Sequence, residues 1–145
     1  PTTEVNALIS CLSSLVYTIC VTAIRQTALD PTVGYVHEPG DRRYTLSLDI
    51  ADIFKPILAD RVLFRTVNRQ QISPSDFEAE LDKCLLTEDG RLTVLKEFES
   101  TLDETVTHQR LNRKVSYKTL VRTDVYSLKK HVLTGEPYHP TRRWW

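Results

Sequence analysis

The sequence predicts an all-α domain of about six or seven helices, packed like a bundle around a long apolar first helix. The chain has 145 residues, of which 41% are hydrophobic and 26% charged, and these values are ordinary for a globular domain. Four glycines and 8% aromatic residues are few for a turn-rich β fold. Long segments with apolar residues at helical spacing complete the case. We therefore predict one domain over residues 1–145.

The first helix is predicted over Glu4–Leu29. Thr2 and Thr3 are both suitable N-caps, and Asp30-Pro31 ends the helix. No residue of the segment Val5–Ile24 carries a formal charge, and this length is sufficient to span a bilayer. Hydroxyl and amide side chains interrupt the segment, so we interpret it as a buried core helix and expect no membrane association.

An ordered loop over residues 30–41 follows, with two prolines and two glycines. Tyr44–Asn68 begins with an alternation that also suits a strand, but its helical spacing persists much longer. We predict a helix there, kinked or restarted near Pro56, because proline lacks the backbone N–H that a helix interior needs.

Ser73–Glu78 is predicted to be a turn that leads into a helix, with Ser75 as the cap and Glu78 three residues later. Residues 87–90 are predicted to form a second turn, because a glycine ends this short polar segment.

A further helix is predicted over Leu92–His108. Its buried stripe would consist of Leu95, Phe98, Leu102 and Val106. Ser116 is predicted to cap a last helix that ends at Gly135, and residues 136–145 are expected to be irregular.

The charged residues are unevenly distributed along a chain of zero net charge. Residues 106–145 carry a net charge of +7, whereas residues 1–60 carry −3 and residues 61–105 carry −4. Such an asymmetry is typical of a surface that binds a polyanion, above all nucleic acid. The alternative is that the basic end neutralises the acidic middle of the same fold.

The three cysteines, Cys11, Cys20 and Cys84, form no CxxC pair. An odd count without such pairs favours a reducing compartment over a disulfide framework, and we expect a cytoplasmic protein. No signal peptide is apparent, and a first residue that is proline indicates a piece of a longer protein.

One group of residues has the composition of a metal site. Asp49 and Asp52 stand three residues apart, so on a helix their carboxylates can converge on one ion, and His37 precedes them in the rigid loop. One imidazole and one or two carboxylates suit Mn²⁺ or Mg²⁺ better than structural zinc. The alternative is a hydrogen-bonded histidine beside a solvated helix start.

Three segments together resemble one family. They are Asn6–Ser10 (NALIS), Leu29–Pro39 (LDPTVGYVHEP) and Arg43–Pro56 (RYTLSLDIADIFKP). The chain resembles the CRISPR-associated integrase, the metal-dependent DNA endonuclease of the spacer-acquisition complex. Tyr138–Pro140, followed by Trp144-Trp145, is similar to the end of proteins in that family, so the resemblance extends over essentially the whole chain.

The resemblance implies a C-terminal helical catalytic domain, without the N-terminal β-rich domain that mediates much of the family's dimer contact. Residue by residue, it implies that His37 and Asp52 are ligands of Mn²⁺ or Mg²⁺ and that Asp49 is a nearby catalytic residue. The family's remaining ligand is a glutamate upstream of the region that matches Pro1. We therefore expect the isolated chain to lack one ligand and to be an incomplete enzyme.

The resemblance also implies a function: insertion of short DNA segments into a repeat array by transesterification, and cleavage of branched DNA. The implied partners are DNA, the small adaptation protein of the CRISPR system and, in the full-length protein, a second copy of the chain. Two alternatives remain, a non-catalytic DNA-binding module and a helical scaffold that docks a protein through Trp144 and Trp145.

Basic side chains near the proposed site and in the basic end are candidate DNA ligands. They are Arg42, Arg43, Arg61, Arg65, Arg110, Lys114, Lys118 and Arg122. For Arg61 and Arg65, pairing with the acidic middle of the chain is an equally good interpretation.

Overall fold

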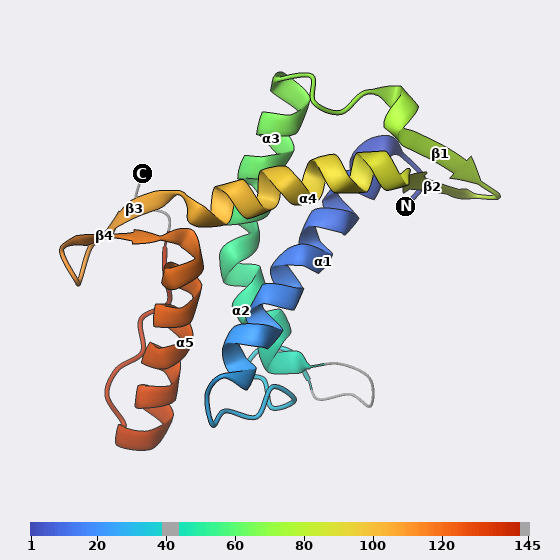
Figure 1. Cartoon of the computed structure of the whole chain (residues 1–145). Coiled ribbons are helices and arrows are strands. Elements are labelled where there is room, and N and C mark those ends of the chain that lie inside the picture. The colour runs from blue at the N-terminus through green and yellow to red at the C-terminus, as the bar shows by residue number, and fades with distance from the viewer. Residues whose placement is uncertain (39–43, 143–145) are drawn as a thin grey trace.

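The computed structural model describes residues 1–38 and 44–142 of the chain. Arg42, Arg43, Trp144 and Trp145 lie outside the described residues, so the predictions for these four are not addressed by the structure. Within the described residues, 61% are helical and 12% are in strands. In this described part of the chain, five α-helices and two small hairpins form the fold, with the first helix in the middle (Figure 1).

Helix α1 spans Glu4–Arg25, and the Oγ1 of its N-cap Thr3 accepts the backbone N–H of Asn6 at 3.2 Å. Its buried residues recur at the spacing of one helix face, as Leu8, Leu12, Val16, Cys20 and Ile24 show. This face packs against α2, the π-helical turn η1 and α5. The predicted core helix is therefore confirmed, although it ends four residues earlier than expected.

The solvent side of α1 carries hydroxyl groups that are bonded to their own helix. Ser14, Thr18 and Thr22 each donate to the carbonyl oxygen four residues earlier, at distances of 2.8–3.0 Å. By length and composition α1 could cross a membrane, with a mean hydropathy of 2.0. The core helices of soluble proteins meet the same criterion, so this property carries no further conclusion.

A single continuous helix follows the loop. It consists of α2 (Thr45–Phe54), the π-helical turn η1 (Lys55–Ala59) and α3 (Asp60–Asn68). In η1 the backbone N–H of Asp60 bonds to the carbonyl of Lys55, five residues earlier. The helix predicted over this segment is thus confirmed and does not restart at Pro56; instead, a wider π-helical turn accommodates the missing proline N–H.

Two antiparallel hairpins contradict the prediction of an all-α fold. Strand β1 (Phe77–Glu80) pairs with β2 (Lys83–Leu86), and β3 (Thr105–His108) pairs with β4 (Arg113–Ser116). The predicted number of six or seven helices is also wrong, because both segments expected to extend or begin helices form strands instead.

The physical reason lies in the shortness of these segments. Four residues are too few to distinguish a helical from a strand period, and their turns use residues in the left-handed region, Leu81 at φ 52° and Asn112 at φ 47°. In the second hairpin Val106 lies opposite Val115, and such β-branched pairs stabilise strands.

The segments around the first hairpin also differ from expectation. Ser73, rather than Ser75, caps the short 3-10 turn η2 (Pro74–Asp76), which leads into a strand. Thr87 is the N-cap of helix α4 (Glu88–Asp103) and accepts the N–H of Gly90 at 3.1 Å. The predicted turn over residues 87–90 is therefore the first turn of α4.

The stripe predicted for this helix is partly correct. Phe98 and Leu102 are buried, whereas Leu95 is 36% exposed and Val106 belongs to β3. The helix ends at Asp103, because Glu104 has an extended backbone that begins the second hairpin.

Helix α5 (Tyr117–Thr134) begins and ends as predicted. The hydroxyl of Ser116 accepts the N–H of Thr119 at 3.1 Å, and Gly135 follows the helix with a φ of 73°. Residues 136–142 form no helix or strand and return along α5, as Figure 1 shows. Tyr138 anchors this tail through its hydroxyl, which donates to Asp124 at 2.6 Å.

Candidate metal centre

The loop between α1 and α2 is held against the first turn of α2 by close contacts. The hydroxyl of Thr45 accepts the N–H of Gly34 at 2.9 Å and donates to the carbonyl oxygen of Thr32 at 2.5 Å. A Cβ at Gly34 would lie 2.8 Å from Oδ2 of Asp49. Only glycine permits this approach, which brings the loop amides within reach of the Asp49 carboxylate.

Asp49 accepts four hydrogen bonds from three consecutive residues of the loop. The backbone N–H groups of Tyr35 and Val36 donate to its Oδ2 at 2.5 and 3.1 Å, and the N–H of His37 donates to Oδ1 at 3.0 Å. The fourth donor is Nδ1 of His37, 2.5 Å from Oδ1. The Asp49 side chain is only 8% exposed, so all its acceptor capacity serves to hold the loop.

These contacts determine the ionisation of Asp49. Burial by itself would raise the pKa of this carboxyl, but the bond to the His37 ring and those from the three backbone N–H groups together hold the pKa below its ordinary value. The carboxylate is therefore ionised at neutral pH, and the loop supplies the donors that a largely buried carboxylate requires.

The same contacts orient the imidazole. A carboxylate can only accept a hydrogen bond, so Nδ1 of His37 donates its N–H to Asp49 and the other ring nitrogen, Nε2, is directed toward Asp52. Nε2 lies 3.6 Å from Oδ2 of Asp52, whose side chain is 51% exposed. The three predicted residues therefore lie together, with Asp49 as the orienting group and His37 and Asp52 as neighbours at the open surface.

Lys55 is a fourth member of this site that the sequence analysis did not assign. Its Nζ lies 2.8 Å from Oδ1 of Asp52, the carboxylate oxygen that does not face the imidazole. Asp52 thus has the ammonium group of Lys55 on one side and Nε2 of His37 on the other. The signal was present in the sequence, because positions three apart on a helix are neighbours.

The chemistry of the donors suits a hard divalent ion. Nε2 of His37 and the Asp52 carboxylate offer one nitrogen and one or two oxygen ligands, and Mn²⁺ or Mg²⁺ with few protein ligands retains several waters. Among the described residues no group of three or more His, Cys, Asp or Glu side chains could hold a metal. His37 and Asp52 therefore offer suitable donor atoms, but they do not by themselves form such a group.

Two of the predicted DNA ligands have partners within the fold. Arg65 forms a bidentate pair with Glu104, in which Nη2 donates to Oε2 at 2.9 Å, and its Nη1 lies 3.7 Å from Glu97. The Arg61 guanidinium lies 5.2 Å from the centre of the Tyr117 ring. These contacts favour the structural interpretation, and DNA contact by Arg61 or Arg65 stays a prediction.

The other described candidates are exposed but do not form one group. Lys118 and Arg122 lie one turn apart on α5 and line a hollow of about 420 Å³ with Glu99 and Asp103 of α4. Lys114 is exposed on β4 and Arg110 lies in the β3–β4 turn, beside a different groove. Phosphate binding by these four residues also stays a prediction.

Comparison with known proteins identifies the family. A family model described as CRISPR associated protein Cas1 matches residues 1–100 of the chain. The chain belongs to the Cas1 family. The family predicted from the three segments around His37 and Asp52 is thus confirmed.

Sequence relatives agree over the full length of the chain. The CRISPR-associated endonuclease Cas1 of Haloferax volcanii is 74% identical over 145 residues, and that of Pyrococcus horikoshii is 42% identical over 144 residues. The chain covers 44% and 45% of these two proteins, respectively. It therefore spans less than half the length of the curated relatives that it matches.

Solved structures share the fold. A Cas1 protein from Thermotoga maritima superposes with a TM-score of 0.87 at 41% identity, covering 92% of this chain and 41% of that one. A casposase bound to its integration product has a TM-score of 0.84 at 22% identity, covering 94% of this chain and 39% of that one. At this identity the casposase shows a common fold and no more.

Proposed function

We propose that this chain is the part of a Cas1 endonuclease and integrase that carries two of its metal ligands and part of its DNA-binding surface. The observation that carries the proposal is the orientation of His37 by Asp49, which turns Nε2 toward Asp52 at 3.6 Å. Curated relatives are named CRISPR-associated endonucleases, and this supports the assignment of a DNA-cutting activity. The fold shared with a casposase bound to an integration product agrees with it.

His37 and Asp52 would hold Mn²⁺ or Mg²⁺, and the remainder of the full-length protein would complete the ligand set, with the upstream glutamate of the family as our candidate. Such an ion would neutralise charge on a phosphate and lower the pKa of an oxygen nucleophile. Asp49 is a positioning residue, because its oxygens are occupied by the loop. Lys55 balances the charge of Asp52 and stands where a phosphate oxygen could approach.

The reaction we propose is transesterification on DNA. The 3′-oxygen of one strand forms a new bond to the phosphorus of a phosphodiester, and the bond from that phosphorus to the 3′-oxygen of the target strand breaks. The proton of the attacking hydroxyl ends on the leaving 3′-oxygen, so the number of phosphodiester bonds is unchanged. Hydrolysis of branched DNA is the same displacement with water as the nucleophile.

The proposed setting is the bacterial or archaeal cytoplasm, with DNA, the small adaptation protein and a second copy of the full-length chain as partners. The basic charge of residues 106–145 supports a role in DNA binding.

The test uses the full-length protein, branched DNA and a short duplex with a labelled target strand. Asp52→Ala and His37→Ala should each reduce metal-dependent cleavage and strand transfer at least about a hundredfold, while circular dichroism shows an intact fold. Asp82→Ala, an exposed carboxylate at the tip of the first hairpin, is the matched control and should retain activity. Full activity of Asp52→Ala would contradict the assignment.

A non-catalytic DNA-binding module is the alternative outcome of this test. It predicts salt-dependent DNA binding by the full-length protein, no metal requirement and no effect of His37→Ala on binding.

A further inference from the structure

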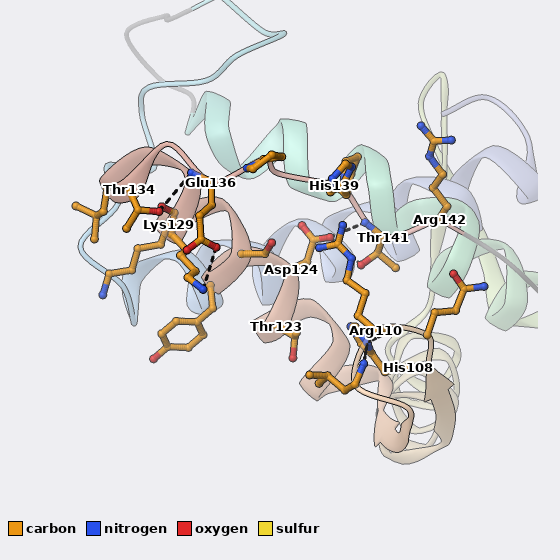
Figure 2. A pocket seen from close by; sticks show the side chains of 18 residues that line it. His108, Arg110, Thr123, Asp124, Lys129, Thr134, Glu136, His139, Thr141 and Arg142 are labelled. Carbon is orange, nitrogen blue, oxygen red and sulfur yellow. Dashed lines mark hydrogen bonds and ion pairs between the residues drawn. The ribbon is translucent and has the colours of Figure 1, made fainter.

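A groove lies on the opposite side of α5 from the core, between that helix, the β3–β4 turn and the tail formed by residues 136–142. We call it the tail groove, and its volume is about 870 Å³. Figure 2 shows that Arg110 extends from the turn toward the tail, and that Lys129 and Arg142 lie at the two ends of the groove. None of the residues of the candidate metal centre lines this groove.

The tail is a fixed wall of the groove. Asp124 is 3% exposed and accepts three bonds from the tail: from the hydroxyl of Tyr138 at 2.6 Å, and from the N–H and hydroxyl of Thr141 at 2.7 Å each. Burial and the neighbouring carboxylate raise the pKa of Tyr138, which therefore remains a hydroxyl donor. Residues 136–142 are anchored at their middle and near their end, so the tail forms a wall of the groove with a defined position.

The β3–β4 turn is fixed in a similar way. Nδ1 of His108 accepts the backbone N–H groups of Arg110 and Leu111, both at 3.2 Å. Burial and the nearby Arg110 and Arg113 lower the pKa of His108, which suits its role as an acceptor at neutral pH. The turn therefore presents the Arg110 side chain to the groove from a defined backbone.

The charge of the groove is positive where it is open. Among the described residues, two carboxylates line the groove, and both have partners. Nζ of Lys130 lies 2.9 Å from the Glu136 carboxylate, and Asp124 accepts hydrogen bonds from the tail. Within residues 1–38 and 44–142, no carboxylate lies within ion-pairing distance of the three remaining cations. These are Arg110, Lys129 and Arg142.

The groove also offers aromatic and apolar surface. Tyr126 is 54% exposed, with the Nζ of Lys129 5.8 Å from its ring centre, and Leu111 and Leu133 are 45% and 69% exposed. Proteins recognise single-stranded nucleic acid by cations that contact successive phosphates and by exposed aromatic rings on which bases stack. A volume within the range of small-ligand sites has room for a short unpaired stretch and not for a duplex.

We propose that the tail groove binds a short single-stranded segment of DNA, with Arg110, Lys129 and Arg142 on its phosphates and Tyr126 under one base. This inference rests on the proposed function, because it assumes that the full-length protein handles DNA with unpaired ends or branches. It adds a subsite that the metal centre does not require.

The test measures fluorescence anisotropy of the full-length protein with a labelled ten-nucleotide oligo(dT) and with a duplex of equal length, over a range of salt concentrations. The groove variant is Arg110→Gln, Lys129→Gln and Arg142→Gln together. The control variant is Lys83→Gln, Arg91→Gln and Lys96→Gln, which removes the same charge from exposed positions elsewhere.

We expect the groove variant to bind oligo(dT) at least about tenfold more weakly than the control variant. Its salt slope should fall by about 2, because each phosphate contact to a single strand contributes about 0.7. Tyr126→Ala alone should weaken oligo(dT) binding about fivefold or more without a change of salt slope. Duplex affinity should change no more in the groove variant than in the control.

Other outcomes overturn the inference. Equal oligo(dT) affinity of the two variants, or an equal loss of duplex binding in the groove variant, refutes a single-strand site in the groove. Competition by poly-glutamate as effective as that by oligo(dT) refutes it in favour of an acidic protein partner. If the wild type binds no DNA at all, both the proposed function and this inference are refuted. If the groove variant keeps metal-dependent strand transfer and binds oligo(dT) as the wild type does, only the inference is refuted.

Discussion

Replacing Asp49 by asparagine tests how the metal centre is built. The change keeps the size of the side chain but replaces one acceptor oxygen by an NH₂ group. Each Asp49 oxygen accepts two bonds, so in either orientation of the amide two loop donors would face another donor.

The magnitude follows from these bonds. A hydrogen bond to a charged group contributes about 1.5–3 kcal/mol, so two lost bonds correspond to about 3–6 kcal/mol. Tyr35 and Val36 are exposed by 64% and 82%, and water can solvate their amides when the loop loosens. We therefore expect the free energy of unfolding to fall by about 3 kcal/mol, which lowers the melting temperature by about 6–12 °C in a domain of this size.

Two measurements on the chain check this expectation: thermal unfolding by circular dichroism, and long-range ¹H–¹⁵N NMR of the histidine rings. In the wild type the His37 ring should carry its proton on Nδ1, and in Asp49→Asn this preference should be lost. Asp30→Asn is the control, because both bonds from Thr32 reach one oxygen of Asp30 and an amide oxygen can keep them. An Asp49→Asn protein with the wild-type melting temperature and an unchanged His37 tautomer would refute the reasoning.

Two further predictions concern the loop and the Arg65 pair. Gly34→Ala places a Cβ 2.8 Å from Oδ2 of Asp49 and 3.0 Å from the backbone of Thr45. It should lower stability by about 1–3 kcal/mol and abolish any Mn²⁺-dependent rise in the melting temperature of the full-length protein, and an unchanged rise would contradict the described close approach. Glu104→Gln should cost about 1 kcal/mol at pH 7, since the pair is partly exposed. The hydrogen bond and charge of Arg65 hold the Glu104 pKa below its ordinary value of 4.5. The ion pair therefore stabilises the folded state fully above pH 4.5, and this stabilisation is lost as the pH falls through the lower pKa of the folded protein. Urea unfolding of both proteins should therefore show a difference at pH 7 that shrinks below about pH 4.5, and a constant difference would exclude this pair as its source.

Helices with strong local signals could be predicted from the sequence. Thr3 caps α1, Ser116 caps α5 and Gly135 follows it, because a cap depends on residues three or four positions apart. The two hairpins could not be predicted, since their stability depends on packing against distant elements. Cys84 of β2, for example, donates its N–H to the carbonyl of Pro1 at 2.9 Å, although Pro1 lies far from it in the sequence.

The candidate site could likewise be predicted only in part from the sequence. The grouping of His37, Asp49 and Asp52 followed from their spacing and from the family resemblance. The separate role of Asp49 did not, because it depends on the backbone path that turns three consecutive N–H groups toward one carboxylate. The pairing of Arg65 with Glu104, 39 residues away, likewise depends on the tertiary fold.

The π-helical turn at Pro56 fixes a spacing between two parts of the molecule. Because η1 inserts one residue relative to an α-helix, it rotates α3 by about 100° with respect to an uninterrupted extension of α2. Asp52 can therefore face the surface loop while Arg65, on the same continuous helix, faces Glu104. Removal of a single residue from Lys55–Ala59 would shorten the chain by less than a turn, yet it would move one of these two side chains off its partner. Insertions and deletions within this helix are therefore constrained by how far they rotate α3 about the helix axis, and not by how much they change the helix length.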